Sequence, residues 1–344
     1  MTTQKRTRPA NAPPVKPGTT MAALVQDEYG QAEDVLRLEQ INHPEIAAGE
    51  ALVRVHAAGV DRGAWHVMTG LPYPVRLVAG IRTPKSRVRG TEFAGQVAAV
   101  GPGVTGLAVG DEVFGIGDGT FAEYATAKQA TIAPKPASLT FEQAAAVGVS
   151  ACTALQAVRD HGRVQPGRQV LVIGASGGVG TFAVQIAKAF GAVVTGVCST
   201  SKIELVRSIG ADHVIDYTRG DDVTDGQRRY DVILDIGGNR SLTALRRALN
   251  PRGTLVIVGG ETTGRWLAGS DRQLRAMALS PFVGQTLRTF IATERTEDLV
   301  VLAELIESGQ VTPVIDRTYP LAEVPAAIRY MQDGRARGKV VITI

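Results

Sequence analysis

The residues best suited to chemistry form a glycine-rich turn between an apolar run and a helical pattern. Residues 170–173 are all apolar, and the turn at 174–180 reads Gly-Ala-Ser-Gly-Gly-Val-Gly. Glycines let a backbone approach a pyrophosphate closely, and the free N–H groups and positive dipole of a helix N-terminus bind its charge. Ala175 stands where the G-x-G-x-x-G pattern has its first glycine, so a purely structural turn is the alternative. The strand-to-helix junction favours a dinucleotide cradle made by Ala175, Ser176, Gly177, Gly178, Val179 and Gly180.

The next apolar segment bears on which dinucleotide is bound. Residues 192–198 are apolar and β-branched, which predicts a strand that ends at Ser-Thr-Ser-Lys. A site for NAD usually places an acid there to bind the ribose 2′-hydroxyl, but no acid occurs before Glu204. Ser199 and Lys202 could bind a 2′-phosphate that a carboxylate would repel. Both residues would also suit a helix N-cap and an exposed first turn. The missing acid favours NADP over NAD.

Composition is compatible with an enzyme of two domains. The chain has 344 residues, of which 44% are hydrophobic, and no apolar run is long enough to span a membrane. The net charge of +4 equals the four basic residues of the first twenty positions, which are Lys5, Arg6, Arg8 and Lys16. The remaining chain is therefore neutral overall, which argues against nucleic acid as a partner.

Residues 1–20 form a leader that contains no acid and is rich in Pro, Thr and Asn. It has no apolar segment of the secretory kind, so we expect a disordered tail, with a basic transit peptide as the alternative. The two cysteines, Cys152 and Cys198, lie in apolar contexts and are expected to be buried free thiols. That state is typical of a reducing, cytoplasmic location.

Periodicity divides the rest of the chain into an α/β fold of two domains. Short strands separated by turns, such as 51–57, 95–100 and 112–114, dominate residues 21–145. A helix begins after Thr140, and helices then alternate with apolar strands at 170–173, 192–198, 213–215, 231–235 and 254–258. That alternation over residues 146–310 predicts a doubly wound parallel sheet. Strands expected at 311–315 and 339–344 return the segment 311–344 to the first domain.

Several stretches resemble one family over residues 21–344. The chain is similar to the zinc-independent medium-chain dehydrogenases/reductases of the quinone oxidoreductase type. That resemblance implies a GroES-like β domain joined to a Rossmann domain, an active site between them, and a homodimer. The matching stretches are Ala-Gly-Val-Asp at 58–61, Arg-Gly-Thr-Glu-Phe-Ala-Gly at 89–95, Val-Gly-Asp-Glu-Val-Phe-Gly at 109–115, Phe-Ala-Glu-Tyr at 121–124, Gly-Ala-Asp-His-Val-Ile-Asp-Tyr at 210–217 and Ala-Arg-Gly-Lys-Val-Val at 336–341.

Residue types argue against a catalytic metal. Zinc-dependent relatives carry Cys in the segment that matches 59–62 and His-Glu where this chain has Thr91-Glu92. Asp61, His66 and Glu92 could form an oxygen-rich set, but zinc prefers Cys, His and carboxylate in a tetrahedron. We expect Glu92 to be a buried structural acid bonded to backbone or arginine, and no metal site.

Without a metal, the acceptor must be one that takes hydride readily. A quinone or an α,β-unsaturated ketone does so when its oxygen is hydrogen-bonded, and a nicotinamide supplies the hydride. The candidates for this pocket are Asp61, Trp65, His66 and Tyr124. Relatives often carry Asn in place of Asp61, and a carboxylate cannot donate a hydrogen bond unless protonated. Trp65 could stack on a flat ring, although core or surface positions are equally open for all four residues.

The resemblance also implies further cofactor contacts. A helix-end threonine lies near the nicotinamide, a tyrosine packs beside the adenosine 2′-phosphate, and glycines end two strands at the cleft. A later segment approaches the nicotinamide, and a C-terminal loop reaches back to the phosphates. In this order the matching residues are Thr153, Tyr217, Gly237, Val258, Gly259, Gly260, Phe290, Ile291, Arg335, Ala336, Arg337 and Lys339.

A basic stretch in the first domain contains Arg76, Arg82, Lys85, Arg87 and Arg89. We expect a solvated loop there, with a mouth that attracts an anionic cofactor or substrate as the alternative. Together these observations predict NADPH-dependent hydride transfer to a quinone or α,β-unsaturated carbonyl. An enoyl or 2-alkenal reductase of a biosynthetic pathway, a zinc-type alcohol dehydrogenase and a non-catalytic NADPH-binding protein are the alternatives.

Overall fold

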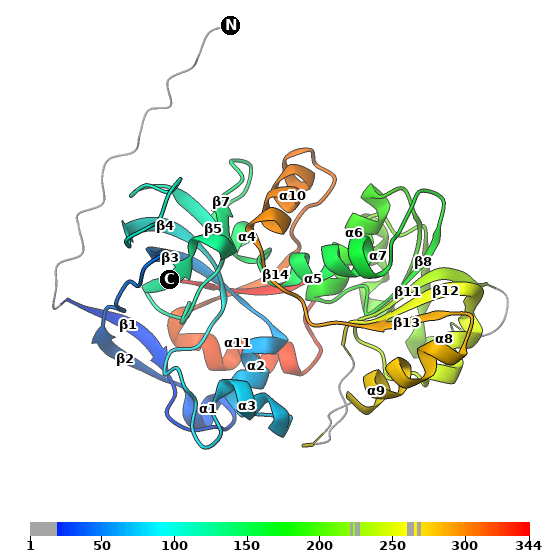
Figure 1. The fold of residues 1–344 in the computed structure, drawn as a ribbon, viewed down its shortest axis with the longest axis horizontal. Helices are drawn as coiled ribbons and strands as arrows, with labels where there is room; N and C mark the ends of the chain where they lie inside the picture. Colours follow the sequence, from blue (N-terminus) through cyan, green and yellow to red (C-terminus); the bar gives the residue numbers. More distant parts are fainter. Residues whose placement is uncertain (1–18, 221–222, 224–227, 260–264, 267–269) are drawn as a thin grey trace, which may run out of the picture.

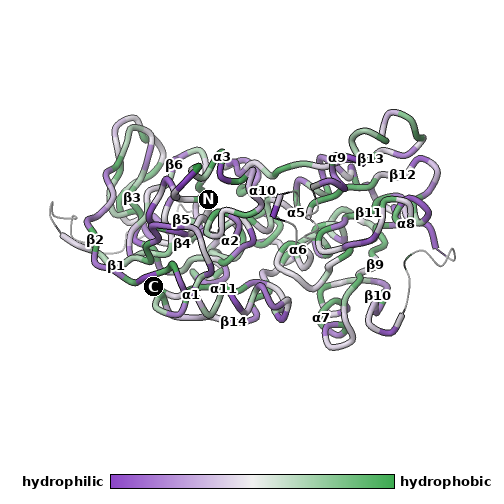
Figure 2. The backbone as a smooth tube through the Cα atoms, turned by 90° about the horizontal axis from the view of Figure 1, so that it is seen from below, coloured by the Kyte–Doolittle hydropathy of each residue, from purple (hydrophilic) through white to green (hydrophobic). Residues whose placement is uncertain are grey.

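The computed structural model describes residues 19–220, 223, 228–259, 265–266 and 270–344. Two lobes lie along the long axis of the molecule, each built on its own sheet, with α5 (Ser150–Gln156) between them (Figure 1). Figure 2 shows the same two lobes from below. The expected α/β fold, a GroES-like β domain with a doubly wound parallel sheet, is confirmed.

The second lobe is built on six parallel strands in the order β10-β9-β8-β11-β12-β13. In chain order this is 3-2-1-4-5-6, the doubly wound arrangement, and the order reverses between β8 and β11. Ligands of such sheets bind outside the carboxyl ends of the strands at this reversal. The strands are β8 (Gln169–Ile173), β9 (Val193–Cys198), β10 (His213–Asp216), β11 (Tyr230–Asp235), β12 (Leu249–Ile257) and β13 (Thr286–Thr289).

Helices cover both faces of this sheet, which explains why its central strands β8 and β11 are mostly apolar and buried rather than alternating. Phe182, Val184 and Ile186 of α6 are fully buried and pack in one cluster with Val170 and Val172 of β8. The helical segments of this lobe are α5, a π turn (Ala157–His161), α6 (Gly178–Ala189), η4 (Thr200–Lys202), α7 (Ile203–Ser208), η5 (Tyr217–Arg219), α8 (Leu242–Ala248), α9 (Ser270–Leu279), η6 (Ser280–Phe282) and α10 (Thr296–Glu307).

The first lobe is built on a mostly antiparallel sheet in the order β14-β15-β3-β4-β5-β7, with β6 also paired to β3. The last strand of the chain, β15, pairs antiparallel with β3. The strands are β3 (Glu50–Val60), β4 (Glu92–Val100), β5 (Glu112–Ile116), β6 (Tyr124–Lys128), β7 (Ile132–Pro134), β14 (Ile315–Pro320) and β15 (Lys339–Thr343), and β1 (Thr20–Val25) and β2 (Arg37–Asn42) form a separate ribbon. The helical segments are α1 (Ala32–Val35), α2 (Arg62–Thr69), η1 (Tyr73–Val75), α3 (Arg76–Ala79), η2 (Gln129–Thr131), α4 (Phe141–Ala145), η7 (Leu321–Glu323) and α11 (Val324–Gln332).

Most local predictions agree with these elements. The expected helix start is confirmed, because the Thr140 hydroxyl accepts from the Gln143 N–H and the Gln143 side chain accepts from the Thr140 N–H. The strand expected at 311–315 is wrong, since β14 begins only at Ile315. Pro313, which has no N–H to donate to a ladder, interrupts the predicted run.

Both cysteines are buried free thiols, as expected. In the part of the chain that the structure describes, none of the helices combines the length and apolarity needed to cross a membrane.

Candidate functional site

The glycine turn lies at the carboxyl end of β8, beside the reversal of strand order. Gly174 has a φ of +85°, and the Ala175 N–H donates to the Val197 carbonyl at 3.1 Å. Helix α6 begins at Gly178 with Gly177 as its N-cap, so no cap side chain accepts from the first-turn N–H groups. Those N–H groups have no partner within the helix and point beyond its N-terminus. The turn therefore offers a row of backbone donors to an anion.

Close backbone packing explains which positions of the turn must be glycine. A Cβ on Gly180 would overlap the Gly174 carbonyl oxygen and lie 2.8 Å from its carbon. A Cβ on Gly177 would meet the same oxygen at an ordinary 3.6 Å. Ala175 is fully buried, and the preceding Gly174 makes the left-handed turn. The departure from G-x-G-x-x-G is thus compensated one residue earlier, which the pattern alone did not reveal.

Lys202, predicted to face a 2′-phosphate, is already engaged with the C-terminal loop. Its ammonium donates to the Gly334 carbonyl at 2.9 Å and to the Ala336 carbonyl at 2.8 Å. Burial lowers its pKa, and the positive charge of Arg337 lowers it further. Since an ammonium has three N–H donors, two of those of Lys202 hold the loop rather than face a ligand. Ser199 is half-buried at the start of η4, immediately after β9.

The C-terminal loop lies against the glycine turn. Gly338 forms an isolated parallel bridge with Gly177, and the Arg337 N–H donates to Asp316 Oδ2 at 3.0 Å. The Arg337 side chain is exposed, whereas Arg335 is paired with Asp333. Ala336 contributes the carbonyl that Lys202 holds. The structure thus brings residues 334–338 to the end of β9, where Arg337 adds positive charge.

A second strand end, that of β10, places an acid beside this position. Asp216 ends β10 opposite Cys198, and its carboxylate accepts from Thr200 Oγ1 at 2.5 Å and from the Thr218 N–H at 3.0 Å. Local hydroxyl and amide donors therefore occupy its charge. Tyr217, expected beside the adenosine, follows it and is 55% exposed.

The loops after β11 and β12 complete the edge of the sheet. The Gly237 N–H donates to the Ile173 carbonyl at 3.2 Å, and a Cβ on Gly174 would lie 3.0 Å from the Gly237 nitrogen. Val258 and Gly259 follow β12, and both of their N–H groups donate to the Asp235 carbonyl. Predicted residues of three loops thus meet at one edge. Gly260 lies outside the described residues.

The predicted nicotinamide contacts are only partly gathered. Thr153 is half-buried on α5, where its hydroxyl donates to the Val149 carbonyl at 2.8 Å. Phe290 stacks on His161 with ring centroids 4.1 Å apart. Ile291 is 95% exposed, so its side chain points to solvent, whereas the ring of the neighbouring Phe290 packs on His161.

Lys339 is engaged by protein partners below the glycine turn. Its side chain is 1% exposed, and its ammonium contacts Glu92, the Ser150 hydroxyl at 3.1 Å and the Val60 carbonyl at 3.2 Å. These three partners account for its three N–H donors. The side chain of Lys339 also lies against the cradle, since a Cβ on Gly178 would be 3.1 Å from Lys339 Cδ, and its contact with the phosphates stays a prediction. Glu92 is the expected buried acid, with backbone N–H and lysine as partners, and burial raises its pKa.

Three of the four candidate catalytic residues lie on or beside α2. Asp61 is its N-cap, with Oδ1 accepting from the Ala64 N–H at 2.9 Å and Oδ2 from the Thr91 hydroxyl at 3.0 Å. Both carboxylate oxygens are engaged, Oδ1 in the helix cap and Oδ2 with Thr91, and a contact of Asp61 with the acceptor stays a prediction. Nδ1 of His66 lies 2.7 Å from the Leu71 carbonyl, and Trp65 meets the His66 ring edge-on at 4.8 Å.

Tyr124 lies on β6, outside the segment of α2 that carries the other three. It pairs with Arg54 across β3 and β6, six residues before the end of β3 at Val60. At about 3.3 Å per residue this separation is roughly 20 Å. Its ring packs on His43 at 4.4 Å and against the cluster of Met21 and Val25, whereas Trp65 packs against another cluster. Trp65 and Tyr124 therefore pack against different clusters, which does not favour one shared pocket, and their common role stays a prediction.

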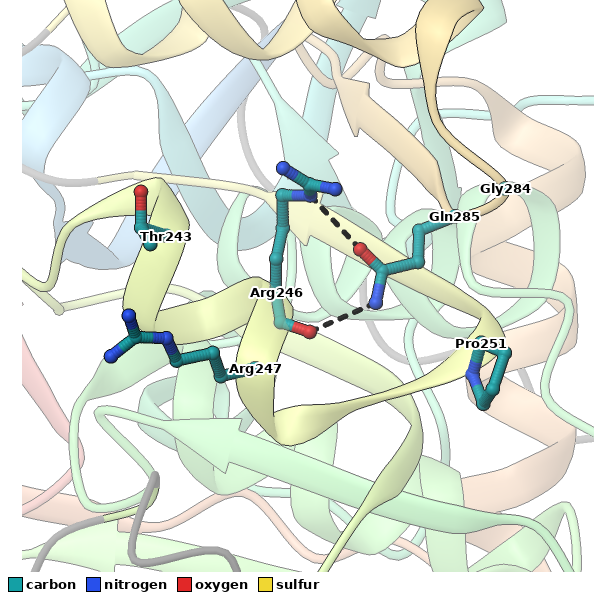
Figure 3. Close-up of a pocket in the computed structure, with 6 residues that line it drawn as sticks. All are labelled: Thr243, Arg246, Arg247, Pro251, Gly284 and Gln285. Atoms are coloured by element: carbon teal, nitrogen blue, oxygen red, sulfur yellow. Dashed lines mark hydrogen bonds between the residues drawn. The ribbon is translucent and has the colours of Figure 1, made fainter.

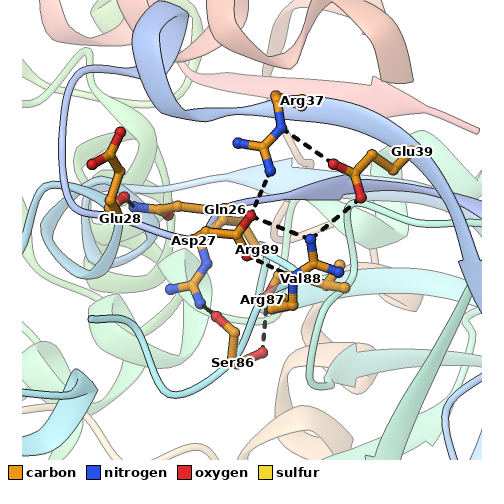
Figure 4. Close-up of polar contacts among 9 residues, drawn as sticks. All are labelled: Gln26, Asp27, Glu28, Arg37, Glu39, Ser86, Arg87, Val88 and Arg89. Atoms are coloured by element: carbon orange, nitrogen blue, oxygen red, sulfur yellow. Dashed lines mark hydrogen bonds and ion pairs between the residues drawn. The ribbon is translucent and has the colours of Figure 1, made fainter.

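Two further predictions concern charge. Within the described residues, no three His, Cys, Asp or Glu side chains gather as a metal would require, and Asp61, His66 and Glu92 form no such group. In the basic stretch, Arg87 pairs with Asp27 at 2.6 Å and with Glu39 at 3.3 Å (Figure 4). Hydrogen bonds from Arg87 and then Arg37 lower the pKa of Asp27 to about 2.

Arg89 donates to the Ser86 carbonyl, and Arg76 packs over the rings of Tyr29 and Tyr73. Arg76, Arg87 and Arg89 therefore contact neighbouring groups of the protein, which does not favour this stretch as an entrance that attracts anions.

A cavity of about 310 Å³ lies at the other end of the second sheet. Its lining residues are Thr243, Arg246, Arg247, Pro251, Gly284 and Gln285, from α8 and the starts of β12 and β13 (Figure 3). Arg246 Nε donates to Gln285 Oε1 at 3.0 Å. Because the cradle is at the carboxyl ends of the strands, this cavity is separate from the predicted cofactor site.

The doubly wound sheet, the glycine turn at its reversal and the adjoining β lobe define a dinucleotide-dependent oxidoreductase. Two family models match, the alcohol dehydrogenase GroES-like domain over residues 47–137 and the zinc-binding dehydrogenase over residues 209–342.

Similar proteins agree with these matches. The mouse NAD(P)H oxidoreductase RTN4IP1, mitochondrial, is 34% identical, with 95% of this chain and 90% of that protein covered. A tomato 2-methylene-furan-3-one reductase is 32% identical over 94% and 79% of the two chains. The structure of the quinone oxidoreductase from Coxiella burnetii matches with a TM-score of 0.81 at 27% identity, over 95% of this chain and all of that one. The chain belongs to the medium-chain dehydrogenase/reductase family of quinone oxidoreductase type, and it is an oxidoreductase that uses a nicotinamide cofactor.

Proposed function

We propose that this protein is a zinc-free oxidoreductase that transfers hydride from NADPH to a quinone or an α,β-unsaturated carbonyl compound. The observation that carries the proposal is the cradle at residues 174–180. There, a side chain at Gly180 would overlap backbone and the first-turn N–H groups of α6 have no cap. The geometry fits a pyrophosphate, because the backbone can approach it closely and donate to it.

Different residues around the cradle would hold different parts of the cofactor. The α6 N-terminus would hold the pyrophosphate, Ser199 and Arg337 the adenosine end, and the loops of Gly237 and Gly259 the nicotinamide end. When bound, the reduced nicotinamide supplies hydride. The protein's contribution is to hold the acceptor at near-attack distance and to exclude water.

The choice of acceptor follows from residue types. Residues 59–62 and 91–92 carry neither thiolate nor imidazole, so the metal that polarises a simple carbonyl in zinc enzymes has no ligand set there. Conjugated acceptors need less polarisation, because hydride addition gives a delocalised anion. Two similar proteins carry names of this chemistry, a quinone oxidoreductase and a 2-methylene-furan-3-one reductase.

An acceptor panel tests the proposal. With NADPH as donor we expect turnover of quinones, 2-alkenals or cyclic enones, and none of a saturated ketone of the same size. Ranking the three classes separates quinone reduction from alkenal or enoyl reduction. Binding of NADPH without turnover of any acceptor would instead support a non-catalytic NADPH-binding protein.

We expect NADPH to bind at least tenfold more tightly than NADH, which is about 1.4 kcal/mol. No acid follows β9 before Glu204, and the charge of Arg337 stands near Lys202. Arg337→Ala should weaken NADPH at least fivefold and NADH less than twofold in fluorescence titrations. Arg329→Ala is the control, since this exposed arginine of α11 pairs with Glu33 and is not among the predicted cofactor contacts. Equal affinities of the wild type for both nucleotides would contradict the assignment to NADP.

Activity is expected to survive chelation. After dialysis against EDTA the rate with the best acceptor should be unchanged, because Asp61 and Glu92 are committed to a helix cap and a lysine rather than gathered as ligands. Metal analysis of the purified protein checks the same point. One zinc per chain, with activity lost on its removal, would show a zinc enzyme instead.

We also propose a homodimer and a cytoplasmic location. Strand β13 is the last of its sheet in the described chain, and such an edge has backbone groups available to pair with a second copy.

The pairing of β15 with β3 supports a first domain made of residues 21–145 and 311–344, with 146–310 as the second. The mouse relative is named as mitochondrial, which keeps the alternative of a transit peptide open. Most of the leader, residues 1–18, lies outside the described residues.

A further inference from the structure

Arg272, the third residue of α9, makes four polar contacts with one guanidinium. Nη1 donates to the Gly238 carbonyl at 2.9 Å and to the Arg240 carbonyl at 3.0 Å. Nη2 donates to the Gly259 carbonyl at 3.1 Å and lies 2.7 Å from Asp235 Oδ2. The Arg272 side chain is 14% exposed, so these contacts are largely shielded from water.

The four acceptors belong to two different loops. Asp235 ends β11, and Gly238 and Arg240 follow it, whereas Gly259 follows β12. Arg272 therefore holds the ends of two neighbouring strands at a fixed separation. A planar guanidinium with five donors can satisfy this arrangement, and a single ammonium on a flexible stem cannot.

The first of these loops also contacts the glycine turn. The N–H groups of Ile236 and Gly237 both donate to the Ile173 carbonyl, at 3.1 and 3.2 Å. A Cβ on Gly174 would lie 3.0 Å from the Gly237 nitrogen, so the two backbones are in close contact. In a doubly wound sheet the first half binds the adenosine end of the cofactor and the second half, β11 to β13, the nicotinamide end. The loops that Arg272 holds are on the nicotinamide side.

The carboxylate beneath the loop belongs to the same arrangement. Asp235 is fully buried, and a Cβ on Gly238 would overlap its Oδ1, so the loop passes directly over it. Burial raises the pKa of Asp235 to about 6, and the charges of Arg272 and Arg240 oppose that shift. Asp235 supplies the counter-charge that a largely buried guanidinium requires.

We propose that Arg272 is a positioning residue for the nicotinamide half of the cofactor. By holding the carbonyls of Gly238, Arg240 and Gly259, it fixes the spacing between the loops after β11 and β12. The inference rests on the proposed function, since it requires the cofactor to bind at this edge of the sheet.

Two ligands separate positioning from general support of the fold. NADPH occupies both halves of the site, whereas adenosine 2′,5′-bisphosphate has no nicotinamide half. Arg272→Met should raise the Kd of NADPH at least tenfold while the Kd of the bisphosphate stays within twofold. Arg275→Met is the matched control on the same helix, where a 76% exposed arginine pairs with Asp271, and it should change neither value.

Arg272→Lys keeps the charge beside Asp235 and provides a folded variant if the methionine variant does not fold. It should raise the Kd of NADPH at least threefold, again with the bisphosphate unchanged. Equal weakening of both ligands would show that Arg272 only supports the fold, and no change in either would show that its contacts do not matter to the cofactor. Failure of the wild type to bind either ligand would refute the proposed function rather than this inference.

Discussion

Gly180→Val is expected to raise the Kd of NADPH at least a hundredfold, about 2.7 kcal/mol. A Cβ at this position would overlap the Gly174 carbonyl oxygen and lie 2.8 Å from Gly174 C and 2.9 Å from Ala175 C. All three are backbone atoms of the turn, so the helix cannot keep its approach to β8 unless the turn itself moves. Displacement of α6 would carry its N–H groups away from the pyrophosphate. Fluorescence titration with NADPH measures the loss.

Gly177→Ala tests whether cofactor binding needs a glycine at a position where the fold does not. Its Cβ would meet only the Gly174 oxygen, at 3.6 Å, which is an ordinary contact. We therefore expect its Tm to stay within about 2 °C of the wild type, a small change for a chain of this size. Any loss of NADPH affinity in this variant reports how closely the pyrophosphate approaches the backbone. If Gly180→Val binds NADPH as the wild type does, the turn is not the cradle.

Local pattern was sufficient for the elements that carry the cradle. Four apolar residues followed by glycines and a helical run describe a buried strand, a tight turn and a helix, and all of this lies within twenty residues. The alanine at 175 is tolerated because the preceding residue, Gly174, makes the turn with its positive φ. The sequence pattern alone does not show this. Sequence spacing does not show which glycine of a cluster makes the turn.

Pairing between distant segments was beyond the reach of the sequence. A motif predicts Tyr124 in the cleft, yet the register of β6 on β3 places it opposite Arg54, in the middle of β3. Lys339 looked like part of a basic loop, but its partner Glu92 is 247 residues away in the chain. The sequence does not predict the contacts of Arg272, because three of its partners are backbone carbonyls, which every residue type has. An acid at the end of an apolar strand, Asp235, was the one available signal of a buried partner.

The largest loss of stability is expected from breaking the buried pair of Glu92 and Lys339. Their side chains are 0% and 1% exposed, and they connect β4, β15 and the start of α5. Removing one partner leaves an uncompensated charge inside the protein, which costs about 3–5 kcal/mol. Glu92→Gln and Lys339→Met should each lower the free energy of unfolding in urea by that amount. Arg207→Met, which breaks an exposed pair with Glu204, should leave it unchanged.

Two further measurements show that the loss arises from the unpaired charge. The double variant Glu92→Gln with Lys339→Met contains no buried charge at this place, so it should be more stable than either single variant. In Lys339→Met the remaining Glu92 loses the charge that opposes the effect of burial, so its pKa in the folded state rises further. A carboxyl group with a raised folded pKa favours the folded state as pH falls, so the deficit of this variant should shrink when the pH is lowered from a neutral to a mildly acidic value. A deficit that is the same at both pH values, or a double variant as unstable as the sum of the singles, would show that the cost comes from lost packing instead.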